Sequence, residues 1–196
     1  MAKPLGFGAL VAYGKGRIGT MGQTLRAMIV AQKPFLRLNP HVLRLPLAIQ
    51  RYDDPFLPYG KAVIAATRDI VGGYVFDLAS YLALGGAGAV ALERTVDYVG
   101  GDVPTILHGA FSSADYAVLC DALSFGVDYI TVTGDVPQAG NTLLWTQQEG
   151  QAQLYWHYPS GKLWEGETST SVTDDGFLGQ WRGEAFADAI RLALLG

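Results

Sequence analysis

The sequence predicts an α/β fold: a parallel sheet of about four β-α units, either open or curled toward a partial, TIM-barrel-like (β/α) barrel, followed by a C-terminal antiparallel hairpin and helix. Two observations lead to this prediction. Strand-like and helix-like segments alternate from about residue 42 to residue 135, as in parallel sheets with right-handed crossovers. The last 61 residues do not continue this alternation and instead carry aromatic residues around a Pro-Ser-Gly turn. At 196 residues and 21.0 kDa, the chain is long enough to bury one core.

Three segments follow from this pattern: a basic N-terminal arm over residues 1–41, a half-barrel β-α domain over 42–135, and a C-terminal hairpin and amphipathic helix over 136–196 that packs on it. Within the half barrel, apolar runs bounded by Gly and Pro indicate strands, and apolar residues at spacings of three and four indicate helices. Asp77 stands where a helix N-cap is needed, and Ser112 with Asp115 resembles a capping box. The predicted strands are 42–50, 74–76, 105–108 and 127–133, and the predicted helices are 58–71, 78–84, 88–99 and 113–125.

The C-terminal segment reads differently. Residues 154–158 and 162–165 predict an antiparallel hairpin with aromatic cross-strand pairs, and residues 142–147 predict a third strand beside it. Residues 183–195 have the pattern of an amphipathic helix. We therefore expect the half barrel to be closed by this hairpin, by a second copy or by another subunit.

Composition indicates a protein with covered surface. Charged residues make up 16% of the chain, against about 25% in an average soluble domain, so we expect a protein partner or a homo-oligomer. The single Cys120 excludes an internal disulfide, fits a cytoplasmic location and suits a small apolar core filler. No apolar run has the length of a transmembrane span, and the first residues show no convincing signal-peptide cleavage site.

Charge is divided unevenly along the chain. Residues 1–52 carry a net charge of +8 with no acidic residue, whereas the remainder carries −12. Such an arm could contact an acidic partner or an anionic membrane face, or fold back on its own acidic body. Nucleic acid is less favoured, because the aromatic tail lacks interleaved Lys and Arg. The candidate docking residues are Lys15, Arg17, Arg26, Lys33 and Arg37.

A glycine motif in the arm needs separate consideration. Gly14, Gly16 and Gly19 match the G-x-G-x-x-G spacing that brings a pyrophosphate to a helix N-terminus. That fingerprint also needs an acidic residue about twenty positions later, yet none occurs before Asp53. We therefore expect no cofactor, a flexible glycine loop, and a packing or docking helix over residues 20–32.

Residues 22–135 resemble orotidine 5′-phosphate decarboxylases. The resemblance lies in an ordered set of segments: Pro46-Leu-Ala-Ile-Gln, residues 56–61 with Ala65-Ala-Thr-Arg-Asp-Ile-Val71, Tyr74-Val-Phe-Asp-Leu-Ala-Ser-Tyr81 with Leu84-Gly, Val90-Ala-Leu-Glu-Arg-Thr-Val96, Val103-Pro-Thr-Ile-Leu107 and Phe125-Gly-Val-Asp-Tyr-Ile-Thr-Val132. It implies the first half of a (β/α)8 barrel with its active site at the carboxyl ends of the strands.

The resemblance also implies catalytic residues that this chain lacks. The family uses a Lys after the second strand and an Asp-x-Lys-x-x-Asp run after the third, where an ammonium group stabilises and protonates the carbanion. Here the first position falls on Val75, and the run falls on His108, Ala110 and Ser113. No Lys lies between Lys61 and Lys162, so no shift of the alignment restores the cations. The family's late phosphate-binding glycine loop and Arg are absent as well.

What remains is a polar crevice after the third and fourth strands, formed by His108, Ser112, Ser113, Thr133 and Asp135. His108 could act as a base for a serine there, or it could be a hydrogen-bonded core residue. His41 and His157 have no neighbours at ligand spacing, so we expect no metal.

Two hypotheses for function follow. The favoured one is a catalytically inactive, decarboxylase-like protein that acts as an interaction or structural subunit of a larger complex. The alternative is a small enzyme, a decarboxylase-like lyase, or a binder of a phosphorylated pyrimidine nucleotide or sugar that uses the strand-end crevice.

Overall fold

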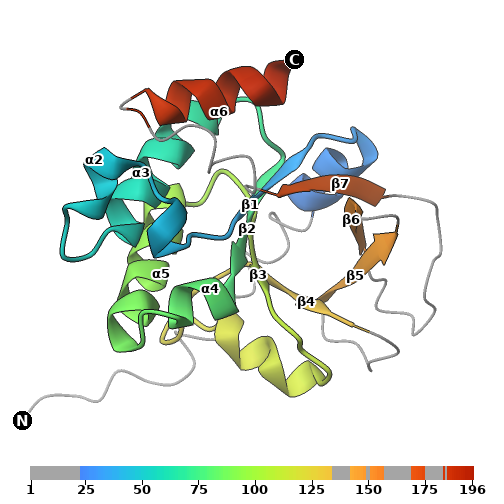
Figure 1. Cartoon of the computed structure of the whole chain (residues 1–196). Coiled ribbons are helices and arrows are strands. Elements are labelled where there is room, and N and C mark those ends of the chain that lie inside the picture. The colour runs from blue at the N-terminus through green and yellow to red at the C-terminus, as the bar shows by residue number, and fades with distance from the viewer. Residues whose placement is uncertain (1–22, 134–141, 149–150, 157–168, 175–182, 184) are drawn as a thin grey trace, which may run out of the picture.

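A computed structural model describes residues 23–133, 142–148, 151–156, 169–174, 183 and 185–196. Seven strands close into one barrel, in which each strand pairs with its neighbours in sequence and β7 returns to β1 (Figure 1). The strands are β1 (Phe35–Leu38), β2 (Gly73–Asp77), β3 (Thr105–His108), β4 (Tyr129–Val132), β5 (Thr142–Gln148), β6 (Gln151–Trp156) and β7 (Ser169–Asp174).

Strand direction divides the barrel in two. β1 to β5 are parallel, β6 is antiparallel to both of its neighbours, and β7 is again parallel to β1. The half barrel that the sequence predicts is therefore present, and the C-terminal strands of the same chain close it. Closure removes the exposed strand edges that a half barrel would otherwise present.

Helices cover one side of the barrel, whereas β5, β6 and β7 form the side away from them (Figure 1). The outward residues of β1 to β4, among them Leu36, Phe76 and Leu107, pack against these helices in the larger of two apolar clusters. This arrangement is the layer structure of an α/β barrel in which the outer helices are concentrated beside the parallel strands. The helical elements are η1 (Val42–Arg44), α2 (Leu47–Gln50), α3 (Phe56–Thr67), α4 (Leu78–Leu82), α5 (Gly86–Val99), η2 (Ala114–Cys120) and α6 (Phe186–Leu195).

The barrel interior forms a second apolar cluster. Inward side chains from all seven strands of the barrel fill it, and Leu25 and Ile29 of the helical residues 23–30 join them. Only residues 31–34 separate this helix from β1, so it lies at the amino end of the barrel and seals it. The strand residues of the cluster are Phe35, Val75, Ile106, Tyr129, Leu143, Leu154 and Val172.

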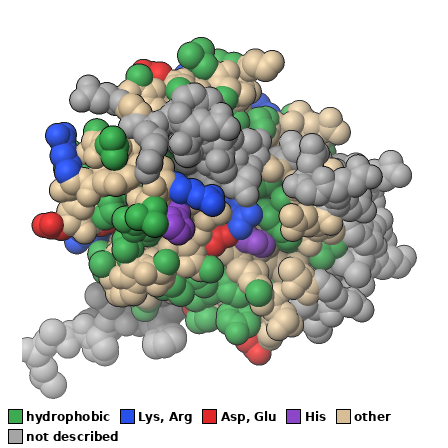
Figure 2. All heavy atoms as spheres, viewed as in Figure 1, with side chains coloured by type: hydrophobic (Ala, Val, Ile, Leu, Met, Phe, Trp, Pro, Cys, Tyr) green, Lys and Arg blue, Asp and Glu red, His purple; other side chains and the backbone are tan. Residues whose placement is uncertain are grey.

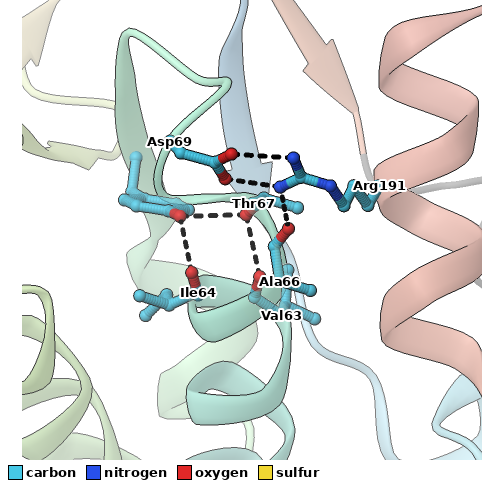
Figure 3. A network of polar contacts seen from close by, with 7 residues as sticks. Val63, Ile64, Ala66, Thr67, Asp69 and Arg191 are labelled. Atoms are coloured by element: carbon cyan, nitrogen blue, oxygen red, sulfur yellow. Dashed lines mark hydrogen bonds and ion pairs between the residues drawn. The ribbon is translucent and has the colours of Figure 1, made fainter.

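The C-terminal helix α6 is held against α3 by both apolar and polar contacts. Ile190 is fully buried, and the Phe186 ring stacks on Tyr59 with centroids 5.9 Å apart. Arg191 donates to both carboxylate oxygens of Asp69 and to the carbonyl of Ala66, the latter at 2.7 Å (Figure 3). The amphipathic helix predicted for residues 183–195 is thus confirmed.

A buried hydroxyl pair lies beside this latch. The Thr67 hydroxyl donates to the Val63 carbonyl, and the hydroxyls of Thr67 and Tyr74 lie 2.9 Å apart. Burial raises the pKa of Tyr74 to about 12, although the hydrogen bond with Thr67 acts in the opposite direction, so the Tyr74 hydroxyl stays protonated and can donate to the Ile64 carbonyl. These bonds join the end of α3 to β2.

Two details of the sequence prediction are wrong. Residues 42–50 form η1 and α2 rather than a strand, and the first strand is Phe35–Leu38, within the segment assigned to the arm. Ser113 rather than Ser112 caps the element after β3, and that element is a 3₁₀ helix ending at Cys120. The strand predicted over residues 142–147 is present as β5 and pairs with β6, which overlaps the predicted hairpin strand 154–158; residues 157–168, where the other hairpin strand was predicted, lie outside the described residues.

Other predictions are confirmed. Strand 105–108 has the predicted bounds, and Asp77 caps α4 by accepting from the Ser80 amide. Cys120 packs against the apolar core. Within the ranges that the structure describes, no helix combines the length and hydropathy needed to cross a bilayer.

Candidate functional site

Polar side chains meet inside the barrel at the carboxyl ends of its parallel strands. They come from inward positions of five consecutive strands, because alternate residues of a strand face the interior. We call this set the mouth cluster: Arg37, Asp77, His108, Thr131 and Trp145. In β/α barrels this end of the strands is where active sites form.

Asp77 is the most constrained member of the cluster. Its Oδ2 accepts from the guanidinium of Arg37, and its Oδ1 accepts from the amide and the hydroxyl of Ser80, each at 3.0 Å. Burial acts to raise the pKa of Asp77, but these hydrogen bonds and the positive charge of Arg37 outweigh it and lower the pKa below its ordinary value. The carboxylate is therefore ionised, and both of its oxygens are engaged in tying β1 to β2 and α4.

His108 lies beside this ion pair. Its Nδ1 lies 2.8 Å from the hydroxyl of Thr131, and its ring stacks on Trp145 with centroids 3.9 Å apart. Burial lowers the pKa of His108, the positive charge of Arg37 lowers it as well, and the negative charge of Asp77 only partly opposes them, so that the pKa is about 4. At neutral pH the imidazole is uncharged, and Nε2 makes no hydrogen bond with any described residue.

Trp145 joins the two halves of the barrel at this site. It belongs to β5, and the guanidinium carbon of Arg37 lies 5.5 Å from its ring centroid. The indole thus contacts the cationic Arg37 of β1 and the neutral His108 of β3. The arrangement offers one neutral imidazole, one compensated ion pair, one hydroxyl and one partly exposed aromatic ring.

The surface at this end of the barrel combines charged and apolar groups. In Figure 2, basic, acidic and histidine side chains lie close together near the centre of the face, with hydrophobic side chains around them. Exposed large hydrophobic residues are concentrated in the segments that directly follow β1, β2 and β3. We call these residues the mouth rim: Val42, Leu43, Leu47, Tyr52, Leu82, Tyr116 and Val118.

The residues predicted for the crevice do not all converge. His108 lies in the mouth cluster, whereas Ser112 and Thr133 are exposed, and Ser113 is occupied in a cap whose hydroxyl donates to Asp115 at 2.9 Å. Asp135 lies outside the described residues. No serine hydroxyl is therefore placed beside His108 by a described contact.

The positions aligned with the family's catalytic residues are also scattered. Val75 is fully buried in the barrel interior, and Ala110 is exposed beyond the end of β3. Of the predicted docking residues, Arg26 is exposed, Lys33 is partly buried just before β1, and Arg37 lies in the mouth cluster. Lys15 and Arg17 lie outside the described residues.

Sequence reasoning did not assign Asp77, Thr131 or Trp145 to the site, and it gave Arg37 a different role. Asp77 and Thr131 could have been found from the two-residue period of a strand, because each follows a buried strand residue, Val75 or Tyr129, by two positions and so faces the same side. No local signal marks Trp145, because its place depends on closure of the barrel by β5. Among the described residues, no group of three His, Cys, Asp or Glu side chains could hold a metal ion.

Fold and site together define a β/α-barrel protein with a polar cluster at the carboxyl ends of its parallel strands. Sequence comparison identifies its relatives. Over 86 residues the chain is 33% identical to an orotidine 5′-phosphate decarboxylase of Flavobacterium johnsoniae, covering 43% of this chain and 32% of that protein. The Herpetosiphon aurantiacus protein of the same name is 34% identical over 100 residues, covering 49% of this chain and 38% of that protein. The Thermomicrobium roseum protein is 36% identical over 101 residues, covering 48% of this chain and 35% of that protein. About half of the chain is thus similar in sequence to part of the orotidine 5′-phosphate decarboxylases.

The extent of this relationship is limited. The matches span about a third of the length of the curated relatives. No family model matches the chain. Among solved structures, a Toxoplasma gondii protein assigned as an orotidine-monophosphate decarboxylase has a TM-score of 0.48 and 26% identity, covering 57% of this chain and 40% of that one.

Proposed function

We propose that this chain does not decarboxylate orotidine 5′-phosphate and serves as an interaction or structural subunit of a larger assembly. The absence of decarboxylation is inferred from the side chains of the mouth cluster. Decarboxylation in the family depends on an ammonium group that can protonate a carbanion. The mouth cluster offers instead a guanidinium, which does not give up its proton, and an imidazole that is already neutral at pH 7.

The positions of the described lysines support the same conclusion. Lys33 precedes β1 and so belongs to the amino end of the barrel, opposite the mouth. Lys61 is exposed on α3, with its ammonium 5.2 Å from the ring centroid of Tyr98. Val75, at the family's first lysine position, contributes only hydrocarbon to the interior cluster.

The mouth rim supports the interaction half of the proposal. Leu43 is 72% exposed and Tyr116 is 46% exposed, in segments that follow different strands at the same barrel end. Exposed apolar groups concentrated on one face are typical of surfaces that contact another protein. We assign the rim to a protein partner or a second copy, and the predicted docking of the basic arm to an acidic surface remains part of this proposal.

The catalytic half is tested by incubating the purified full chain with orotidine 5′-phosphate and measuring released carbon dioxide. The Thermomicrobium roseum relative, assayed in parallel, controls for substrate quality. We expect no release above the buffer rate. Release that rises in proportion to the concentration of this chain would refute the proposal.

The interaction half is tested by affinity purification of the tagged full chain from its own cells, followed by size-exclusion chromatography with light scattering. We expect a stoichiometric companion or a homo-oligomer. A Leu43→Ser/Leu47→Ser variant should lose it, whereas Leu192→Ser, on exposed α6, should retain it. Elution of the unmodified chain as an isolated monomer would contradict this half.

A second candidate function is a small-molecule binder, which would use the mouth cluster for a nucleotide-like or sugar-like ligand. The observation in its favour is the position of His108, whose neutral ring stands beside Thr131 and Trp145 with Nε2 unengaged by any described residue. Imidazole, hydroxyl and indole groups gathered at one end of a barrel are suitable ligand contacts.

A further inference from the structure

The charge state of the mouth cluster restricts the ligand that it could hold. Arg37 is the only cation that the described residues bring into the cluster, and Asp77 compensates it directly. His108 adds no charge at neutral pH, because burial keeps its ring deprotonated. The cluster therefore has no net positive charge with which to hold a phosphate group.

A phosphate ester would also meet an unfavourable neighbour. To reach the Arg37 guanidinium it would have to compete with the Asp77 carboxylate, which Ser80 holds in place through two further hydrogen bonds. Two anions on one partly buried guanidinium repel each other, and the displaced carboxylate would lose its compensation. Anionic ligands are thus disfavoured at this site.

Neutral polar ligands face no such penalty. Nε2 of His108 can exchange one hydrogen bond with a ligand hydroxyl or ring nitrogen, accepting or donating according to which way the Thr131 hydroxyl bond runs. Trp145 is partly exposed and supplies an aromatic surface against which a sugar ring or a base can pack. A paired carboxylate and guanidinium can still accept and donate hydrogen bonds at their outer edges without a change in net charge.

We propose that the mouth cluster binds an uncharged, hydroxyl-bearing ring compound of the class that free nucleosides and monosaccharides represent, and that it discriminates against their phosphate esters. This inference rests on the second candidate function and specifies its ligand class. His108 and Trp145 are the recognition residues, and the Arg37–Asp77 pair is the element that excludes anions.

The experiment is a titration of the full chain by isothermal calorimetry with two matched pairs: uridine against uridine 5′-monophosphate, and ribose against ribose 5-phosphate. Each titration is carried out at low and at moderate sodium chloride. We expect one neutral member to bind at least about tenfold more tightly than its phosphate ester, a difference of about 1.4 kcal/mol. Its affinity should not change with salt, since no net charge is neutralised on binding.

Variants locate the binding. His108→Gln and Trp145→Phe should each weaken the neutral ligand about tenfold, whereas Lys61→Ala, on the outer surface of α3, should leave it unchanged. Circular dichroism establishes that each variant is folded. Tighter binding of either phosphate ester, or no heat of binding from either neutral probe at about 10 mM, would overturn the inference. These outcomes are independent of carbon dioxide release, so failure here leaves the inactivity proposal standing.

Discussion

At the scale of single residues, the mouth of this barrel uses its charged groups for structure. Asp77 accepts from Arg37 of β1 and from Ser80 of α4, so one carboxylate fixes the relative position of two strands and a helix. The Ser80 hydroxyl lies beside the side-chain oxygen of Asn39 as well, so its single hydrogen is shared between Asp77 and Asn39, which follows β1. A carboxylate with all these partners is a poor base and a poor nucleophile, because every reaction would first break its bonds.

Replacing Asp77 by Asn should therefore lower stability rather than reveal a catalytic defect. Asn keeps the capping oxygen but leaves the Arg37 guanidinium uncompensated, which we expect to cost about 2 kcal/mol of unfolding free energy. Because the pKa of Asp77 is lowered in the folded state, its contribution is complete above the unfolded pKa and is lost as the pH falls through the folded one. The gap between wild type and variant, measured by urea unfolding, should therefore shrink below about pH 4.

A matched control is Asp69→Asn. It breaks the Arg191 pair on the surface, where Asp69 is 65% exposed. Its effect on unfolding should be clearly smaller than that of Asp77→Asn, because solvent screens an exposed ion pair. An equal effect of both substitutions would contradict the structural role assigned to Asp77.

His108 gives a second residue-scale prediction, with a different pH range. Its pKa is lowered from 6.5 to about 4 in the folded state. The unfolded chain therefore takes up a proton first as the pH falls, and stability should decline from about pH 6.5 to about pH 4 by up to about 3 kcal/mol. Nuclear magnetic resonance of the imidazole should show a neutral ring at pH 5.5, and the His108→Gln variant should lose this part of the pH dependence. A ring that titrates near pH 6.5 would exclude the buried stacking described here.

At the scale of elements, the outer helices differ in how firmly they are attached. α6 comes from the far end of the sequence, yet it packs on α3 through buried Ile190 and Phe186 and through the bonds of Arg191 shown in Figure 3. Its opposite face exposes Leu192 and Leu195. Burial of Ile190 and Phe186 therefore holds α6 on α3, and the ion pair of Arg191 with Asp69 fixes the orientation of the helix.

Substitutions on the two faces of α6 should separate these contributions. Ile190→Ala removes a fully buried side chain and should lower the unfolding free energy by about 2 to 4 kcal/mol. Leu192→Ala, at 69% exposure, should change it by less than about 0.5 kcal/mol. Thermal and urea unfolding followed by circular dichroism measure both. Comparable losses from the two variants would mean that α6 does not pack as described.

The elements also show which parts of the fold local sequence could reveal. β2 and β3 were predictable because each is a short buried run followed by an N-cap or a glycine. β1 was not, because Arg37 interrupts its apolar pattern and its partner Asp77 lies forty positions away. The run from Val42 to Gln50 was misassigned because short apolar runs are ambiguous, and Pro46 stands at a helix N-terminus there rather than at a strand bulge.

The site was less predictable than the fold for a related reason. His108 could be found because it ends a strand, as the barrel rule requires. Its stacking partner Trp145 belongs to a strand that joins the barrel only through pairing with β4. No pattern within residues 142–148 encodes that pairing, so the sequence left open whether the hairpin, a second copy or another subunit closes the half barrel.

At the scale of the whole molecule, barrel closure makes the family-like and C-terminal parts one cooperative unit. The interior cluster combines Val75 and Ile106 of the parallel strands with Leu143, Leu154 and Val172 of the closing strands. Side chains from both parts share the same packed space, so neither part retains its core when the other is removed. This shared interior explains how a segment similar to about a third of the decarboxylase relatives can belong to a closed barrel.

The test of this view is a substitution in β6, far from the family-like residues. Leu154 is fully buried in the interior, and Leu154→Ala should lower the unfolding free energy by about 2 to 5 kcal/mol. Because both parts share one core, tryptophan fluorescence and far-ultraviolet circular dichroism should report a single coincident transition in wild type and variant alike. Hydrogen exchange should show β2 and β3 amides losing protection together with those of β5 and β6. If β2 and β3 instead kept their protection while β6 opened, the closing strands would be an accessory to an independent half barrel, and the mouth cluster would have to be reconsidered without Trp145.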